Sequence, residues 1–130
     1  FETERCHINT FEKTDSTDVK KLFVNKDVEY LGGIRDEKSI KAVLKSMLNL
    51  SERSFYWAIR EKHTDDFMGI VSLNPHHDDG FLEVSYQFLP AWWEKGYARE
   101  TDFNVFDFVF KSLHCGTSLI FAESLYLTCN

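Results

Sequence analysis

One segment, residues 80–101, limits what this 130-residue chain can fold into more than any other part of it. The segment opens with side chains of alternating character, in the order Leu82, Glu83, Val84, Ser85, Tyr86, Gln87 and Phe88. A period of two is typical of a strand with one packed and one wet face, so Glu83 should share a face with Ser85 and Gln87. Pro90 cannot donate to a sheet ladder, and strand pairing should therefore end there.

The second half of this segment predicts a binding turn at the start of a helix. Trp92 and Trp93 are expected to wall the exit from the strand, and Gly96 and Ala98 precede a long amphipathic stretch. The first N–H groups of a helix have no intrahelical partner and lie at the positive end of the helix dipole, so they can hold a phosphate. Gly96 lets such a ligand approach the backbone closely, and Ala98 adds little bulk.

Several short motifs elsewhere in the chain belong to the same pattern. They are Glu-Thr-Glu-Arg at 2–5, Tyr-Leu-Gly-Gly at 30–33, the strand-like runs at 55–59 and 67–71, Leu-Pro at 89–90 and Trp-Glu-Lys-Gly-Tyr-Ala at 93–98. In their order and spacing, from residue 2 to about residue 123, they resemble the GNAT superfamily of N-acetyltransferases, in particular its RimJ/RimL-like branch.

The resemblance implies an α/β (α+β) fold, the GNAT acyl-CoA N-acyltransferase fold, in a single domain over residues 1–130. This fold has a mixed, mostly antiparallel twisted sheet flanked by helices. Hydrophobic periodicity predicts strands at 2–11, 55–61, 67–73, 82–88 and 118–122, with polar turns at 63–66 and 76–80.

Three helices are predicted between these strands. The apolar stripes that define them are Val19, Leu22 and Phe23; then Ile40, Val43, Leu44, Met47 and Leu48 after a cap at Asp36; then Phe103, Phe106, Phe110 and Leu113. Gly32 and Gly33 separate the first two helices, and Cys115 and Gly116 are expected to end the third.

The C-terminal part departs from the family pattern. We expect the last helix and strands of the fold to be missing, either in a naturally short form or in a fragment of a longer product. A hydrophobic edge left in this way could be covered by a second chain, so a homodimer is a possible assembly.

The resemblance also implies acetyl-CoA as cosubstrate. Backbone groups of Trp93, Glu94, Lys95, Gly96, Tyr97, Ala98 and Arg99 would hold its diphosphate. Backbone groups of Phe88 and Leu89 would pair with the pantetheine arm, and one of these two N–H groups would stabilise the oxyanion. The slot for the arm would form where the Glu83 strand and the 118–122 strand separate.

Glu83 is the candidate general base, because a carboxylate at this point of the strand has that role in some superfamily members. A primary amine titrates near pH 10.4 in water and must be neutral to attack, so a base is useful. The plainer interpretation of Glu83 is a solvated polar position on a strand. The general acid is unassigned, since it is often a tyrosine from the segment that this chain lacks.

Composition excludes other classes of function. The formal net charge of −6 leaves no basic footprint for nucleic acid and weakly favours a cationic acceptor. No apolar run is long enough to cross a membrane. Three cysteines without paired spacing indicate reduced thiols and a cytoplasmic location. Neighbouring residues such as His76 and His77 do not form a coordination shell, so no metal is expected.

We therefore predict an N-acetyltransferase that moves the acetyl group of acetyl-CoA to a primary amine by direct attack in a ternary complex. The acceptor could be a protein N-terminus, a polyamine or a small amine. The first alternative is a non-catalytic, truncated module of the same fold that binds acyl-CoA or another subunit. The second is an interaction domain without CoA, in which the 93–99 loop would be empty.

Overall fold

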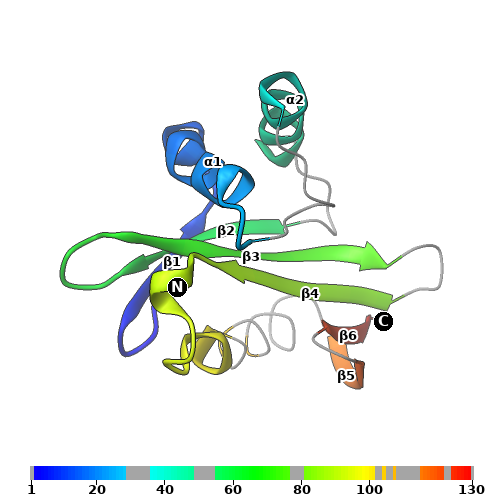
Figure 1. Cartoon of the computed structure of the whole chain (residues 1–130). Coiled ribbons are helices and arrows are strands. Elements are labelled where there is room, and N and C mark those ends of the chain that lie inside the picture. The colour runs from blue at the N-terminus through cyan, green and yellow to red at the C-terminus, as the bar shows by residue number, and fades with distance from the viewer. Residues whose placement is uncertain are drawn as a thin grey trace.

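The computed structural model describes residues 2–28, 36–48, 55–76, 81–101, 104, 107, 115–121 and 124–129. Its first half contains β1 (Cys6–Thr10), η1 (Lys13–Asp15), α1 (Ser16–Val24), α2 (Glu37–Leu48) and β2 (Phe55–Glu61). The second half contains β3 (Phe67–His76), β4 (Phe81–Phe88), η2 (Pro90–Trp92), a helix that begins at Tyr97, β5 (Cys115–Phe121) and β6 (Ser124–Cys129). Figure 1 shows their arrangement.

The strands form one six-stranded sheet in the order β1-β2-β3-β4-β6-β5. Every described pair of neighbouring strands is antiparallel, with Ile8 opposite Ile59, Ser72 opposite Ser85, and Val84 opposite Leu125. The central hairpin of β3 and β4 pairs along eight positions, from Gly69 opposite Phe88 to His76 opposite Phe81. It is the platform on which the predicted site is built.

Two hydrophobic clusters cover the two faces of the sheet. On the α1–α2 face, Leu22, Phe23 and Ile40 are buried against Ala58 and Ile70 of the sheet, and we call this cluster the α1–α2 core. The opposite face is covered by the helix that begins at Tyr97 (Figure 1). There Tyr97 and Ala98 pack against a second cluster, Cys6, Ile8, Trp57, Ile59, Met68, Val71, Leu73, Val84 and Phe88, which we call the Tyr97-side core.

The first two helices follow their sequence patterns closely. In α1, Val19, Leu22 and Phe23 are all buried, as predicted. Asp36 caps α2 as predicted, because its Oδ2 accepts a hydrogen bond from the Ser39 N–H at 2.9 Å. One residue of the predicted α2 stripe is different: Leu48 is 39% exposed, since it lies at the last turn of the helix.

Two predicted strand boundaries need correction. Strand β1 begins at Cys6 and not at residue 2, because the Thr3 N–H bonds to the Cys6 carbonyl at 2.9 Å and closes a turn there. Strand β3 continues past residue 73 through Pro75 to His76. Proline is tolerated at this point because β2 pairs with β3 only as far as Leu73.

The C-terminal strands differ most from the prediction. Strand β5 begins at Cys115, three residues before the strand predicted at 118–122, and residues 124–129, for which no strand was predicted, form β6. Strand β6 lies between β4 and β5, so the Glu83 strand does not neighbour the strand predicted at 118–122. The slot expected between those two strands is therefore absent from the described residues.

Some predictions fall outside the described residues, namely the Gly32–Gly33 break, residues 77–80 of the turn predicted at 76–80, and the third apolar stripe. Within the described ranges, no helix has the length and apolar character that a membrane span requires.

Candidate functional site

Strand β4 ends where Pro90 was expected to end it. The Leu89 N–H makes the last bond to β3, to the Met68 carbonyl at 2.8 Å. Pro90 then begins the short η2 helix, in which the Trp92 N–H bonds to the Leu89 carbonyl at 3.0 Å and the Trp93 N–H to the Pro90 carbonyl at 3.2 Å. The chain thereby turns away from the sheet within three residues.

The turn after η2 has an unusual backbone that leaves its N–H groups exposed. Glu94 and Gly96 are both left-handed, with φ of 59° and 80°. The first bond of the next helix runs from the Glu100 N–H to the Gly96 carbonyl at 3.2 Å. Within the part of the chain that the structure describes, no acceptor takes a hydrogen bond from the N–H groups of residues 94–99. These donors lie in the turn and in the first turn of the helix, and they are open to a ligand.

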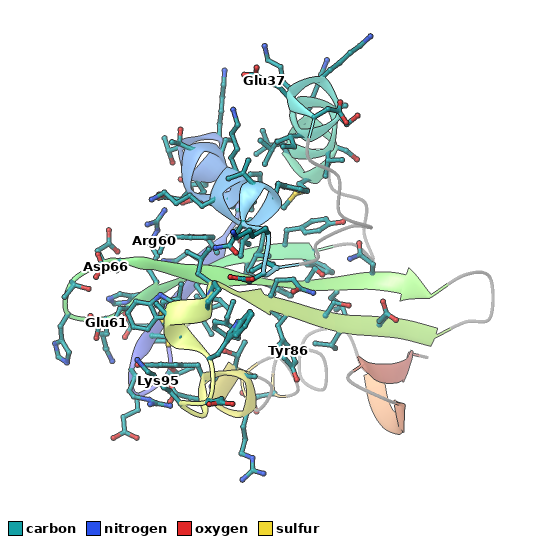
Figure 2. All side chains as sticks on the ribbon, viewed as in Figure 1. Glu37, Arg60, Glu61, Asp66, Tyr86 and Lys95 are labelled. Carbon is teal, nitrogen blue, oxygen red and sulfur yellow. The ribbon has the colours of Figure 1, made fainter. Side chains whose placement is uncertain are left out.

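A hollow of about 700 Å³ lies at this turn. Its walls come from the end of β4, from η2 and from the start of the helix: Tyr86, Gln87, Phe88, Trp92, Trp93, Glu94, Lys95, Gly96, Tyr97, Ala98 and Arg99. Eight of the nine residues predicted to bind cofactor are among them, and Leu89 is not. Figure 2 shows Tyr86 and Lys95 on the side of the sheet opposite to α2, whose Glu37 is labelled.

Aromatic residues give the hollow a firm wall. The Trp93 Nε1–H donates to the Phe88 carbonyl at 2.7 Å, which fixes that indole across the end of β4. The Trp92 ring meets Tyr97 edge-on at 5.8 Å, and Tyr97 in turn lies 6.5 Å from Phe88 between ring centroids. The Lys95 Nζ lies 5.8 Å from the Trp92 ring. Trp92 and Trp93 therefore both pack and line the site.

The edge of β4 next to the hollow is the side that faces away from β3. In an antiparallel pair, successive residues direct their N–H and C=O groups to opposite sides. Since Leu89 bonds to β3, Phe88 directs its N–H to the opposite edge. Strand β6 pairs with that edge only from Phe81 to Val84. The edge beyond Val84 thus leads directly to the hollow.

Leu89 needs correction as a site residue. Its N–H is bonded to Met68 and its carbonyl accepts from Trp92, so both backbone groups have partners within the protein. Its side chain packs with the α1–α2 core, on the far side of the sheet. Of the two predicted oxyanion donors, only Phe88 directs its N–H to the open edge.

Glu83 lies apart from the hollow. It is half-buried on β4, opposite Asn74 of β3, and its Oε1 accepts a hydrogen bond from the Ser85 hydroxyl at 3.2 Å. It shares a face with Gln87, whose partner Ile70 belongs to the α1–α2 core. Glu83 lies four positions before Gln87 along the strand, about 13 Å at the usual rise. Glu83 therefore faces the side opposite to the Tyr97 helix.

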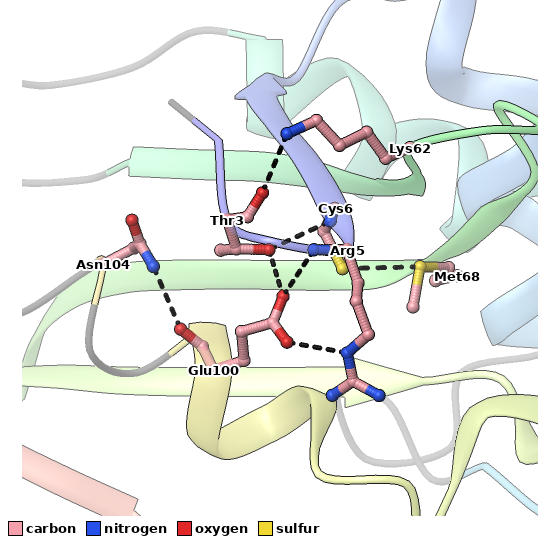
Figure 3. Close-up of polar contacts among 7 residues, drawn as sticks. All are labelled: Thr3, Arg5, Cys6, Lys62, Met68, Glu100 and Asn104. Atoms are coloured by element: carbon pink, nitrogen blue, oxygen red, sulfur yellow. Dashed lines mark hydrogen bonds and ion pairs between the residues drawn. The ribbon is translucent and has the colours of Figure 1, made fainter.

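Sequence reasoning missed an ion pair behind the turn. Glu100 accepts hydrogen bonds from the Arg5 Nε at 2.8 Å, from the Arg5 backbone N–H at 3.1 Å, and from the Thr3 hydroxyl (Figure 3). Burial opposes ionisation of Glu100, but the Thr3 and Arg5 bonds outweigh it and lower the pKa of this carboxyl. The hydrogen bond to Glu100 raises the pKa of Arg5. Thr3 and Arg5 lie in the motif at 2–5 and Glu100 follows the motif at 93–98 by two residues, but no spacing rule pairs residues this far apart.

Comparison with known proteins identifies the family. The model of the family described as "Acetyltransferase (GNAT) domain" matches residues 5–125. This match covers most of the chain, which therefore belongs to the GNAT acetyltransferases, and the protein is an acetyltransferase of that family.

The individual relatives are distant. The uncharacterized N-acetyltransferase YoaA of Bacillus subtilis (strain 168) is 23% identical over 119 residues, which are 87% of this chain and 67% of YoaA. Spermidine N-acetyltransferase from Vibrio cholerae, solved with CoA and spermine, has a TM-score of 0.68 and 16% identity, over 84% of this chain and 66% of that one.

A third relative is ribosomal-protein-S5-alanine acetyltransferase from Vibrio fischeri. Its structure has a TM-score of 0.67 and 19% identity, over 86% of this chain and 67% of that one. At these identities the two solved structures show the likeness of fold alone.

Proposed function

We propose that this protein transfers the acetyl group of acetyl-CoA to a primary amine by direct attack within a ternary complex. The observation that carries the proposal is the run of N–H groups at residues 94–99, which have no acceptor among the described residues and border the hollow. Unpaired backbone donors at the start of a helix suit the negative charge of a diphosphate.

The residues around these donors fit the proposed ligand. Lys95 and Arg99 add two positive charges to the lining of the hollow, against one negative charge from Glu94. The left-handed turn at Gly96 keeps side-chain bulk away from the backbone where a diphosphate would lie. The β4 edge beyond Val84 offers the Phe88 N–H to the pantetheine arm, as an added strand would be held. When bound, acetyl-CoA supplies the activated acetyl group.

The amine would approach from the opposite face of the sheet. Glu83 lies on the α1–α2 face, whereas the hollow lies on the Tyr97 side. A base on the far side of the β4 edge can take the proton of the amine without crossing the diphosphate site. Glu83 accepts that proton directly or through a water, given its distance along the strand. The Phe88 N–H is the remaining candidate for stabilising the oxyanion.

The acceptor is proposed only as a class, a primary amine. Structural relatives named for spermidine and for the alanine of a ribosomal protein support this class. The RimJ/RimL-like branch, the cytoplasmic location and a homodimer remain predictions from the sequence.

Thermal melting with acetyl-CoA tests the binding step. A ligand at 100 times its dissociation constant stabilises the folded state by about 2.7 kcal/mol, so the melting temperature should rise clearly. Gly96→Trp should abolish this rise, because an indole would fill the turn. Val24→Trp is the matched control, since Val24 is 55% exposed on α1, and it should keep the rise. If acetyl-CoA raises the melting temperature of Gly96→Trp as much as that of wild type, acetyl-CoA binds at another site.

Release of free CoA thiol tests the transfer step. We expect thiol release in the presence of spermidine, of alanine-initiated peptides or of other primary amines, and Glu83→Gln should lower kcat without changing acetyl-CoA affinity. If Glu83→Gln keeps its activity across pH, that carboxylate is only scaffold. Binding without thiol release from any amine would favour the non-catalytic acyl-CoA-binding module.

A further inference from the structure

The N-terminal segment is tied to the proposed diphosphate turn through one carboxylate. Glu100 lies in the first turn of the helix that begins at Tyr97, and its side chain is 18% exposed. Its carboxylate accepts three hydrogen bonds, all from residues 3–5, as Figure 3 shows. The start of this helix is therefore held by a segment more than ninety residues earlier in the chain.

Arg5 touches the turn itself as well as Glu100. Its guanidinium carbon lies 3.9 Å from the centre of the Tyr97 ring. Its Nη2 lies 3.6 Å from the position that a Cβ on Gly96 would occupy. One side chain thus contacts Tyr97 and Glu100, the first and fourth residues of the helix, and lies beside Gly96, the last residue before it.

The segment that carries Arg5 is itself fixed to the sheet. The Cys6 N–H donates to the Thr3 hydroxyl at 3.0 Å, and the Lys62 N–H donates to the Arg5 carbonyl at 2.9 Å. The Lys62 ammonium donates to the Thr3 carbonyl at 3.3 Å (Figure 3). Thr3 is buried, and Cys6 is the first residue of β1. Arg5 therefore connects the turn to a rigid part of the molecule.

Arg5 does not line the hollow, but it supports residues that do. Tyr97, on which it stacks, contacts both Trp92 and Phe88 in the aromatic wall. Glu94 and Gly96 hold left-handed backbone conformations, and that of Glu94 costs free energy that the surroundings must supply. A contact that locks the turn in this shape prepares its N–H groups for a ligand.

We propose that Arg5, held by Glu100 and Thr3, is a positioning residue that preforms the diphosphate-binding turn and thereby sets the affinity for acetyl-CoA. This inference rests on the proposed function, because that function names acetyl-CoA as the ligand. The effect of Arg5 on the shape of the turn does not depend on it. If the turn adopts the binding shape only part of the time, its apparent affinity for the ligand is reduced in proportion to the fraction of molecules in that shape. Lysine cannot replace Arg5, because an ammonium cannot both donate as the guanidinium does and stack flat on Tyr97.

Arg5→Met and Arg60→Met form a matched pair for the test. Arg60 is also a partly buried arginine, with ion pairs to Asp15 at 2.9 Å and Asp18 at 2.8 Å and its guanidinium 5.5 Å from the Phe67 ring. Both variants keep an apolar stem and lose a charge that is paired and stacked. Only Arg5 contacts the turn, so only Arg5→Met should affect it.

The first measurement uses the protein without ligand. Hydrogen exchange of the residue-100 amide, whose bond to the Gly96 carbonyl at 3.2 Å closes the turn, should be about tenfold faster in Arg5→Met than in wild type if the turn opens more often, as mass spectrometry can measure. Arg60→Met should leave the exchange of this amide unchanged. Arg5→Lys should resemble Arg5→Met, and Glu100→Gln, which keeps the shape of the side chain, should also speed exchange if Arg5→Met does not fold.

The second measurement is calorimetric titration with acetyl-CoA. Arg5→Met should bind about tenfold more weakly, whereas Arg60→Met should bind as wild type does, and kcat at saturating acetyl-CoA should be unchanged in both. Unchanged exchange at the residue-100 amide in both Arg5→Met and Glu100→Gln would overturn the inference, whether or not acetyl-CoA binds. A wild-type protein that binds no acetyl-CoA would instead overturn the proposed function, and the exchange data would still decide whether Arg5 holds the turn.

Discussion

Two glycines in this protein are required for different physical reasons. A Cβ on Gly69 would lie 2.1 Å from the Gln87 carbonyl oxygen, because β3 and β4 approach too closely there for any side chain. At Gly96 there is room for a Cβ, but φ of 80° disfavours every other common residue except asparagine and aspartate. Gly69 is therefore required for the close pairing of β3 with β4, and Gly96 is required for the left-handed backbone of the proposed binding turn.

Alanine at these two positions should therefore give different defects. Gly69→Ala should lower the free energy of unfolding by about 3 kcal/mol, since the β3–β4 backbone must move apart. Gly96→Ala should cost only about 1–2 kcal/mol from its left-handed backbone and should weaken acetyl-CoA binding. Urea denaturation and calorimetric titration measure the two effects. Equal losses of stability would show that space, and not backbone conformation, limits both sites.

Asparagine separates conformation from bulk at the turn. Asparagine tolerates the left-handed region, so Gly96→Asn should lose less stability than Gly96→Ala. A Gly96→Asn protein that is as unstable as Gly96→Ala would contradict the backbone explanation.

The pH dependence of stability should report the ionised Glu100. Its pKa is lowered in the folded state despite burial, because Thr3 and Arg5 bond to the charged form. The carboxylate therefore adds stability above the unfolded value of about 4.3, and this contribution is lost as pH falls through the lower folded value. The difference in unfolding free energy between wild type and Glu100→Gln should be constant from about pH 5 to 7 and shrink below about pH 4. Urea midpoints across this range measure it, and a difference that grows on acidification would contradict the assignment.

The sequence predicts some site residues and cannot predict others. Gly96 and the residues around it are recognisable because a local pattern, strand then turn then helix, determines where unpaired N–H groups arise. The Leu89 N–H was predicted to serve the ligand, but which side of a strand bonds to its neighbour depends on register, which the sequence alone leaves open. Arg5 and Glu100 are paired only by the tertiary fold.

At the scale of elements, α1 is attached to the sheet by a single arginine as well as by its apolar stripe. Arg60 on β2 is 19% exposed and pairs with Asp15 at the end of η1 and with Asp18 in α1. Figure 2 shows Arg60 at the end of the sheet beneath α1. These two ion pairs join segments more than forty residues apart in the chain.

Removing this attachment should destabilise the protein measurably. Arg60→Met leaves two partly buried carboxylates without their partner and should lower the free energy of unfolding by about 2–3 kcal/mol, somewhat less than for a fully buried pair. Lys20→Met is the control, because the Lys20–Glu37 pair is exposed and 3.5 Å long, and should change it by less than about 0.5 kcal/mol. Urea denaturation compares them, and similar effects of the two substitutions would show that the Arg60 pairs add little.

Prediction succeeded best for elements with strong periodicity and local punctuation. The α1 stripe, the Asp36 cap and the bounds of β2 follow from spacing within a few residues. The place of β6 between β4 and β5 does not, because its partners are chosen by pairing across the sheet and not by any local signal. The same limitation explains the wrong neighbour assigned to the Glu83 strand.

At the scale of the whole molecule, net charge is a poor guide to the acceptor. The chain carries −6 overall, yet five lysines line a groove of about 790 Å³ formed by residues of η1, α1 and α2: Lys13, Lys20, Lys38, Lys41 and Lys45. A ligand near this groove meets a local potential opposite in sign to the net charge. The weak preference for a cationic acceptor, predicted from composition, therefore does not extend to this face.

The shared sheet should make the two faces unfold together. The three tryptophans all report the Tyr97 side, since Trp57 belongs to its core and Trp92 and Trp93 line the hollow, whereas the α1 and α2 helices lie on the other face. Leu22→Ala removes a fully buried side chain from the α1–α2 core and should lower the free energy of unfolding by about 3 kcal/mol. Because both cores rest on the same strands, tryptophan fluorescence and far-ultraviolet circular dichroism should shift to the same lower urea midpoint.

Acetyl-CoA affinity well below that midpoint should be unchanged in Leu22→Ala, because the hollow lies across the sheet from the cavity that the substitution creates. Separate midpoints for the two signals would instead show that the α1–α2 face unfolds as an independent unit. In that case the Tyr97 side, with its proposed diphosphate turn, would retain its structure and its ligand after the helices had melted, and acetyl-CoA would raise the fluorescence midpoint alone.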